Sequence, residues 1–223
     1  MHDGTPLAVG VAIVSAVLAG PYLAGLTRTA PDRDQPRWWH TRRVAGARIG
    51  TTIAIAVSLA VLGALATGWA ASLPAFVCLA STCAVLVIVD VECHRLPDRV
   101  VAAAAVLGTV LLAAATAVTA DGSAFLRATL AAAAAFSLLF VAALLARRGL
   151  GFGDVKLGAL LGGHLGWLGW GQLTYGLFAG FVVGAVAALA LVATGRASLR
   201  TSLPFGPALI AGAFTVAAGS AVF

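Results

Sequence analysis

Long apolar runs separated by short polar segments make up most of the chain. A run of about 20 mostly apolar residues can cross a bilayer as a helix. The pattern predicts eight such helices, over residues 6–26, 49–69, 73–90, 100–120, 126–146, 157–172, 175–194 and 204–222. The sixth and seventh share one apolar run, which we divide at the cluster of glycines in "GWGQLTYG". The chain is therefore predicted to be an all-α polytopic membrane protein with about eight transmembrane helices.

Composition supports this class and excludes an ordinary soluble domain. Hydrophobic residues make up 61% of the chain and charged residues 10%, whereas soluble domains average about 25% charged residues. The net charge of +6 does not indicate a nucleic-acid partner, because the cations occur in short blocks between apolar runs. We therefore expect contact with a lipid bilayer and not with nucleic acid. The three cysteines form no CxxC pair, so no metal or other cofactor is expected.

The distribution of Lys and Arg predicts the orientation of the helices. If the Arg-rich loop 27–48 is cytoplasmic, alternation of the eight helices places 13 of the 14 Lys and Arg residues on that side. Only Arg127 falls on the other side. Such a bias is typical of cytoplasmic loops, so we expect a multi-pass protein of the plasma (inner) membrane with both termini outside the cytoplasm.

Two of the predicted cytoplasmic loops hold four of the eight acidic residues. Asp90 ends an apolar run, where the helix C-terminus and partial burial both disfavour a carboxylate. A structural role therefore explains Asp90 poorly. Asp98 follows Pro97 and is expected to cap the next helix. Glu92 and His94 are expected to be solvated loop residues.

The second loop contains "GLGFGDVKLG", residues 149–158. Asp154 could cap a helix starting near residue 155, and Lys156 could extend to the lipid headgroups. Neither role explains Gly151 and Gly153, since glycine permits positive φ and the close approach of another backbone. A backbone that comes close to an aspartate suggests a peptide substrate.

Two aspartates on the same side of the membrane suggest one chemistry. A pair of carboxylates that shares a proton can hydrolyse a peptide bond, because one activates water while the other polarises the carbonyl. Like charge raises one pKa of such a pair, and the helix N-terminus beside Asp154 is expected to favour its ionised form. A proton-coupled transporter, with His164 as relay partner, is the alternative, and it would need acids near the bilayer midplane. A non-catalytic assembly subunit would be favoured only if an aspartate were missing.

Three segments resemble the type IV prepilin peptidases, which are membrane aspartyl proteases of the GxGD class. "GFGDVK" resembles the GxGDxK signature, "DVECHRLPD" resembles the first catalytic stretch, and "LPFGPALIAGA" resembles the segment that opens the last helix. They occur in the family's order, and the resemblance covers the chain from about residue 73 to the end. We therefore expect a six-span peptidase domain over 73–223, preceded by an N-terminal two-span region over 1–72 with its short Arg-rich loop.

The resemblance implies a membrane aspartic endopeptidase that cleaves the leader of prepilins or pseudopilins after Gly on the cytoplasmic side. It makes Asp90 and Asp154 the catalytic pair. It also implies that residues around them shape the substrate-binding loops, namely Gly151, Gly153, Lys156, Pro97 and Asp98. Many members carry CxxC pairs in an early loop linked to N-methylation. The loop 27–48 has no cysteine, so N-methyltransferase activity is not expected.

Overall fold

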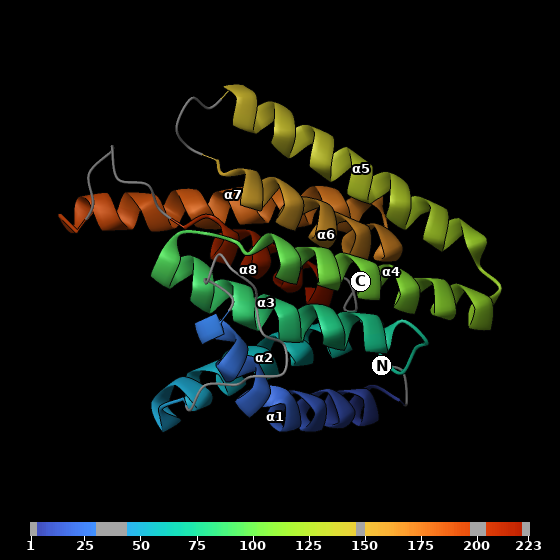
Figure 1. Cartoon of the computed structure of the whole chain (residues 1–223). Helices are drawn as coiled ribbons and strands as arrows, with labels where there is room; N and C mark the ends of the chain where they lie inside the picture. Colours follow the sequence, from blue (N-terminus) through green and yellow to red (C-terminus); the bar gives the residue numbers. More distant parts are fainter. Residues whose placement is uncertain (1–3, 30–43, 146–149, 197–203, 220–223) are drawn as a thin grey trace.

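The computed structural model describes residues 4–29, 44–145, 150–196 and 204–219. Within these ranges the chain forms eight α-helices and no strand. Figure 1 shows them as a bundle of antiparallel neighbours. The helices are α1 (Thr5–Thr29), α2 (Gly46–Thr67), α3 (Leu73–Cys93), α4 (Asp98–Thr119), α5 (Gly122–Leu145), α6 (Phe152–Leu168), α7 (Trp170–Ala193) and α8 (Gly206–Gly219).

The helical architecture confirms the prediction of an all-α membrane protein. Six of the helices are long and apolar enough to cross a bilayer, whereas α6 has 17 residues and α8 has 14. The largest differences from the predicted ends are at α6 and α7, each of which begins five residues early. The first turn of α6 admits Asp154 and Lys156, and Gly169 alone separates α6 from α7.

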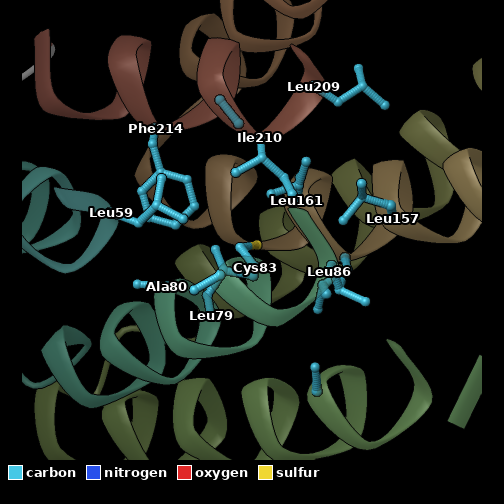
Figure 2. Packing of buried hydrophobic residues seen from close by; sticks show 14 of the residues in the cluster. Leu59, Leu79, Ala80, Cys83, Leu86, Leu157, Leu161, Leu209, Ile210 and Phe214 are labelled. Atoms are coloured by element: carbon cyan, nitrogen blue, oxygen red, sulfur yellow. The ribbon is translucent and has the colours of Figure 1, made fainter. Parts of the chain in front are cut away.

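Small residues bring the helices into close contact. Gly158, Gly162 and Gly166 recur every fourth residue along α6, and each faces a side chain of α5. An added Cβ at Gly162 would lie 2.6 Å from the Cβ of Ala135. Such stripes let the backbones of membrane helices approach one another. One hydrophobic cluster contains residues of all eight described helices, and its centre lies among α2, α3, α6 and α8 (Figure 2).

Arg127, the exception to the charge sorting, closes the C-terminal end of α6. Its Nε donates to the carbonyl oxygen of Gly166 at 2.7 Å, and its Nη2 donates to that of Trp167 at 2.7 Å. These carbonyls lie in the last turn of α6, where no intrahelical donor remains for them. A cation at a helix C-terminus also interacts favourably with the helix dipole. The unpaired carbonyl groups at the C-terminal end of α6 therefore explain why a cation is found at this end of the bundle.

The alternation of the helices brings the starts of α4, α6 and α8 to the end of the bundle where α3 finishes, on the left in Figure 1. α3 packs against α4 and α8, and α6 packs against α4 and α8. Segments 85–100, 150–158 and 204–208 consequently meet at one end of the bundle. Most of the cations in the Arg-rich loop, as well as Arg147, Arg148 and Arg200, lie outside the described residues.

Candidate active site

Asp90 lies in the last turn of α3 with its side chain buried. Its Oδ2 accepts a hydrogen bond from the backbone N–H of Gly206, the first residue of α8, at 3.1 Å. The N-terminus of a helix carries unpaired N–H groups and partial positive charge. The start of α8 therefore supplies the favourable environment for a carboxylate that the C-terminus of α3 lacks.

Glycine at position 206 allows this contact. A Cβ at Gly206 would lie 2.8 Å from Oδ2 of Asp90 and 3.4 Å from its Cγ. It would also lie 3.5 Å from Cδ2 of Leu157 on α6. The absence of a side chain thus lets α8 approach both α3 and α6 at the Asp90 carboxylate.

Asp154 lies in the first turn of α6, and its side chain is also buried. Its Oδ2 accepts a hydrogen bond from the backbone N–H of Gly151 at 3.0 Å. Gly151 is the N-cap residue of α6, so the prediction that Asp154 caps a helix from residue 155 was wrong in position. Asp154 stands at the third helical position, from which an acidic side chain reaches back to the N-cap N–H.

Burial raises the pKa of the Asp154 carboxyl to about 6, against the smaller lowering effect of the Gly151 N–H. The charge of the nearby Asp90 carboxylate raises this pKa further. The N–H group at the helix N-terminus favours the ionised form of Asp154, as expected, but desolvation outweighs this one backbone hydrogen bond. Asp90 and Asp154 thus lie at the same end of the bundle, near enough for the charge of Asp90 to affect Asp154.

Gly151 and Gly153 do not adopt the positive φ that we considered for them. Gly151 has φ −77° and ψ 151°, and Gly153 also lies outside the left-handed region. The close approach is made by a side chain, since a Cβ at Gly153 would lie 2.9 Å from the Cβ of Leu96. Leu96 belongs to the loop between α3 and α4. Gly153 therefore lets this loop pack directly on the first turn of α6, beside Asp154.

The expected cap by Asp98 was wrong, because Pro97 is the N-cap residue of α4 and no side chain caps that end. Oδ1 of Asp98 instead lies 2.7 Å from Nζ of Lys156. Lys156 Nζ also lies 4.7 Å from the centroid of the Phe152 ring, a cation–π distance. Lys156 thus joins the start of α4 to the start of α6.

Two contacts of the N-terminal helices were not anticipated from the sequence. Glu92 is exposed as predicted but pairs with Arg48 of α2, whose Nη2 lies 2.5 Å from Oε1. Arg48 Nη1 also donates to Oγ1 of Thr27 on α1 at 2.8 Å. His94, also exposed, ends α3 in the left-handed conformation with φ 50°. Arg48 therefore ties α1 and α2 to the segment that follows Asp90.

His164 does not join this site. It lies ten residues after Asp154 on the same helix, a rise of about 15 Å. Its Nδ1 lies 2.9 Å from the carbonyl oxygen of Leu160, and its ring packs edge-on against Phe76. The described residues contain no group of three or more His, Cys, Asp or Glu side chains that could hold a metal ion.

Comparison with known proteins places this site in a family. The model of the "Type IV leader peptidase family" matches residues 77–189, just over half of the chain, and this segment includes both aspartates. Over 83 residues the chain is 42% identical to the "Prepilin leader peptidase/N-methyltransferase" of Bacillus subtilis (strain 168), covering 37% of this chain and 32% of that relative.

Two further relatives match similar stretches. "Leader peptidase HopD" of Escherichia coli is 44% identical over 70 residues, covering 31% of this chain and 44% of the relative. The "Prepilin leader peptidase/N-methyltransferase" of Pseudomonas putida is 40% identical over 78 residues, covering 34% of this chain and 26% of the relative. The matched stretch thus spans less than half the length of each relative. No solved structure is significantly similar to the chain.

Proposed function

Because the chain belongs to the type IV leader peptidase family, we propose that it is a membrane aspartic endopeptidase that removes the leader of prepilin-like proteins after Gly. The observation that carries this proposal is the coupled pair of buried carboxylates. Asp90 and Asp154 come from different helices, each accepts one backbone N–H, and the charge of one raises the pKa of the other. Carboxylates in this relation can share a proton.

The surroundings of the two groups support an assignment of roles. The pKa of Asp154 is raised to about 6, chiefly by burial, so this carboxyl is suited to hold the shared proton. Asp90 receives the Gly206 N–H at the start of α8, which stabilises a negative charge. Asp90 is therefore the general base and Asp154 the general acid.

The reaction then proceeds by attack of water on the peptide carbonyl. The Asp90 carboxylate takes a proton from a water molecule while the water oxygen bonds to the carbonyl carbon. Asp154 donates its proton to the carbonyl oxygen. As the tetrahedral intermediate collapses, that proton returns to Asp154, the C–N bond breaks, and the proton on Asp90 passes to the leaving nitrogen. The products are a leader that ends in a Gly carboxylate and a mature chain with a free amine.

The site is proposed to face the cytoplasm. Supporting this orientation, the described cations Arg48, Arg95, Arg99 and Lys156 gather at the end of the bundle that carries the aspartates. An excess of Lys and Arg marks cytoplasmic loops. A substrate with a basic leader before its apolar helix would then present its cleavage site at this membrane boundary.

The proposed peptidase unit is 73–223, with Gly151, Gly153, Pro97, Asp98 and Lys156 shaping its loops. The two-span region is 1–72; its helices α1 and α2 pack against α3, and Arg48 of α2 pairs with Glu92. We propose that this region supports the position of α3 and that the chain cleaves without methylating the product.

Cleavage by the purified protein tests the function. A suitable substrate has a short basic leader ending in Gly, followed by about 20 apolar residues that hold it in a bilayer. After incubation in proteoliposomes, mass spectrometry of both products should show a single cut after Gly and an unmodified amine, with or without S-adenosylmethionine. An intact substrate, in the presence of protein with native helical content, would contradict the proposed function.

A further inference from the structure

A groove of about 490 Å³ lies between α4, α5 and α6. Figure 1 shows α4 and α5 diverging from the turn that connects them, toward the end of the bundle where α6 begins. Asp98 and Lys156 line the groove at that end, and Leu112 and Phe125 line it at the other. The volume is within the range of about 300–1,000 Å³ that is common for ligand sites. We call this hollow the α4–α5 groove.

The α4–α5 groove is long and runs along the helices. On α4 its lining extends from Asp98 to Leu112, a rise of about 21 Å. On α6 it extends from Lys156 to His164, a rise of about 12 Å. The hydrocarbon core of a bilayer is about 30 Å thick. The groove therefore follows a large part of the depth of the membrane and suits an extended apolar occupant.

The walls of the groove offer few free polar groups. The hydroxyl of Thr109 donates to the carbonyl oxygen of Ala105 at 2.8 Å, and that of Thr129 donates to Phe125 at 3.0 Å. Both hydroxyls thus bond within their own helices. Six of the other wall residues are small, namely Ala102, Ala105, Ala128, Ala132, Ala159 and Gly163. Small apolar walls allow a further helix to approach closely in a membrane.

The groove begins at the end of the bundle that carries the candidate active site, although neither Asp90 nor Asp154 is among its lining residues. Lys156, which lines this end of the groove, stands in the first turns of α6 together with Asp154. Asp98, the other residue at this end, is the ion-pair partner of Lys156. A chain whose peptide bond lies at the two carboxylates, and whose next residues are apolar, therefore enters the bilayer at the level where the groove begins.

We propose that the α4–α5 groove holds the apolar helix that follows the cleavage site of the substrate. This inference rests on the proposed function and adds the surface that positions the uncleaved chain. The length of the groove, the small residues in its walls and its start at the end of the bundle that carries the aspartates favour a helix over a lipid chain as occupant. One face of the helix contacts Ala102, Ala132 and Ala159, and the other faces lipid.

Filling the groove tests the proposal against a matched control. Ala132 lines the groove, whereas its neighbour Ala133 is exposed and does not line it. Ala132→Phe should lower kcat/KM for the membrane-held substrate by about tenfold or more, because the added ring occupies space needed by the helix. Ala133→Phe should stay within about twofold of the wild type. Equal rates for the wild type and both variants would overturn the groove as a binding site.

Photocrosslinking keeps the test decisive if Ala132→Phe fails to fold. A small photoreactive diazirine side chain is placed in the apolar helix of the substrate, and the protein carries only Asp154→Asn, so that the groove keeps its native side chains and the bound substrate is not cleaved. The proposal predicts crosslinks that map to Ala132 and its neighbours in the groove, with few to Ala133. Crosslinks to lipid alone, or equal crosslinking to Ala132 and Ala133, would overturn it.

The outcomes separate this inference from the proposed function. If the wild type cleaves the substrate but the groove positions neither affect cleavage nor crosslink to it, the peptidase assignment stands and the groove proposal fails. If the wild type does not cleave the substrate, the proposed function fails and the groove proposal falls with it.

Discussion

Replacing Gly206 by alanine perturbs the Asp90 carboxylate without changing any charge or hydrogen-bonding group. The added Cβ would lie 2.8 Å from Oδ2 of Asp90, whereas ordinary contacts of a Cβ begin at 3.4 Å. The carboxylate or the start of α8 must therefore move by about 0.6 Å. Gly206 is not in the left-handed region, and alanine is the better helix former. The substitution should therefore disturb the position of the Asp90 carboxylate and change the stability of α8 little.

The size of the effect follows from the displacement. A misplacement of about 1 Å can reduce the rate of an enzyme by about 100-fold. A shift of about 0.6 Å, which also disturbs the hydrogen bond from the Gly206 N–H, should lower kcat by about tenfold or more. KM should change less, because the substrate still binds along the same surfaces.

Single-turnover cleavage in proteoliposomes measures this effect directly. Gly219→Ala is the matched control, because it lies in the same helix and its added Cβ would meet nothing within 4 Å. Gly219→Ala should cleave at the wild-type rate, and both variants should retain the thermal unfolding midpoint of the wild type. If folded Gly206→Ala cleaves within twofold of the wild type, the positioning of Asp90 by the start of α8 is refuted.

Three further predictions concern Asp154, the Asp98–Lys156 ion pair and Arg127. Burial raises the pKa of Asp154 to about 6, and a general acid must carry its proton. We therefore expect kcat/KM to fall as the pH rises above about 6. A kcat/KM that is constant from about pH 5 to 8 would contradict the role of Asp154 as general acid. Asp98→Asn and Lys156→Gln should each retain activity within about fivefold in the same cleavage assay, because Asp98 is exposed, Lys156 is partly exposed, and ion pairs near the surface contribute about 0–1 kcal/mol. Arg127→Gln should lower the free energy of unfolding by about 1–3 kcal/mol, because two carbonyl groups at the end of α6 lose a charged donor. Unfolding in detergent measures this loss, and Arg127→Lys should recover part of it.

The helices could be predicted from sequence because hydropathy is a local property. Each of the eight predicted runs is a helix, and the break between α6 and α7 lies at Gly169, within the predicted cluster of glycines but before the predicted gap between residues 172 and 175. The start of α6 was predicted too late, because Asp154 and Lys156 are polar and a hydropathy pattern excludes them. In the structure the first turn of α6 lies at the end of the bundle, where its polar groups find partners in Gly151 and Asp98.

The contacts of the candidate site depend on residues far apart in the chain and could not be read locally. Gly206 and Asp90 are 116 positions apart. The segment around Gly206 was noticed through a family resemblance, but its contact with Asp90 was not. Likewise, the sequence contains no signal that Asp98 would pair with Lys156 instead of capping α4. The raised pKa of Asp154 arises from burial, which only the packing of the helices reveals.

The central claim is that Asp90 and Asp154 act together to hydrolyse a peptide bond, and the most direct measurement is cleavage by Asp90→Asn and Asp154→Asn. Each variant would be compared with the wild type and with Asp98→Asn in proteoliposomes, with both products identified by mass spectrometry. The account predicts no cleavage by either variant and retained cleavage by Asp98→Asn, because an amide can neither take up nor share the proton. Cleavage at the wild-type rate by folded Asp90→Asn or Asp154→Asn would contradict the catalytic pair.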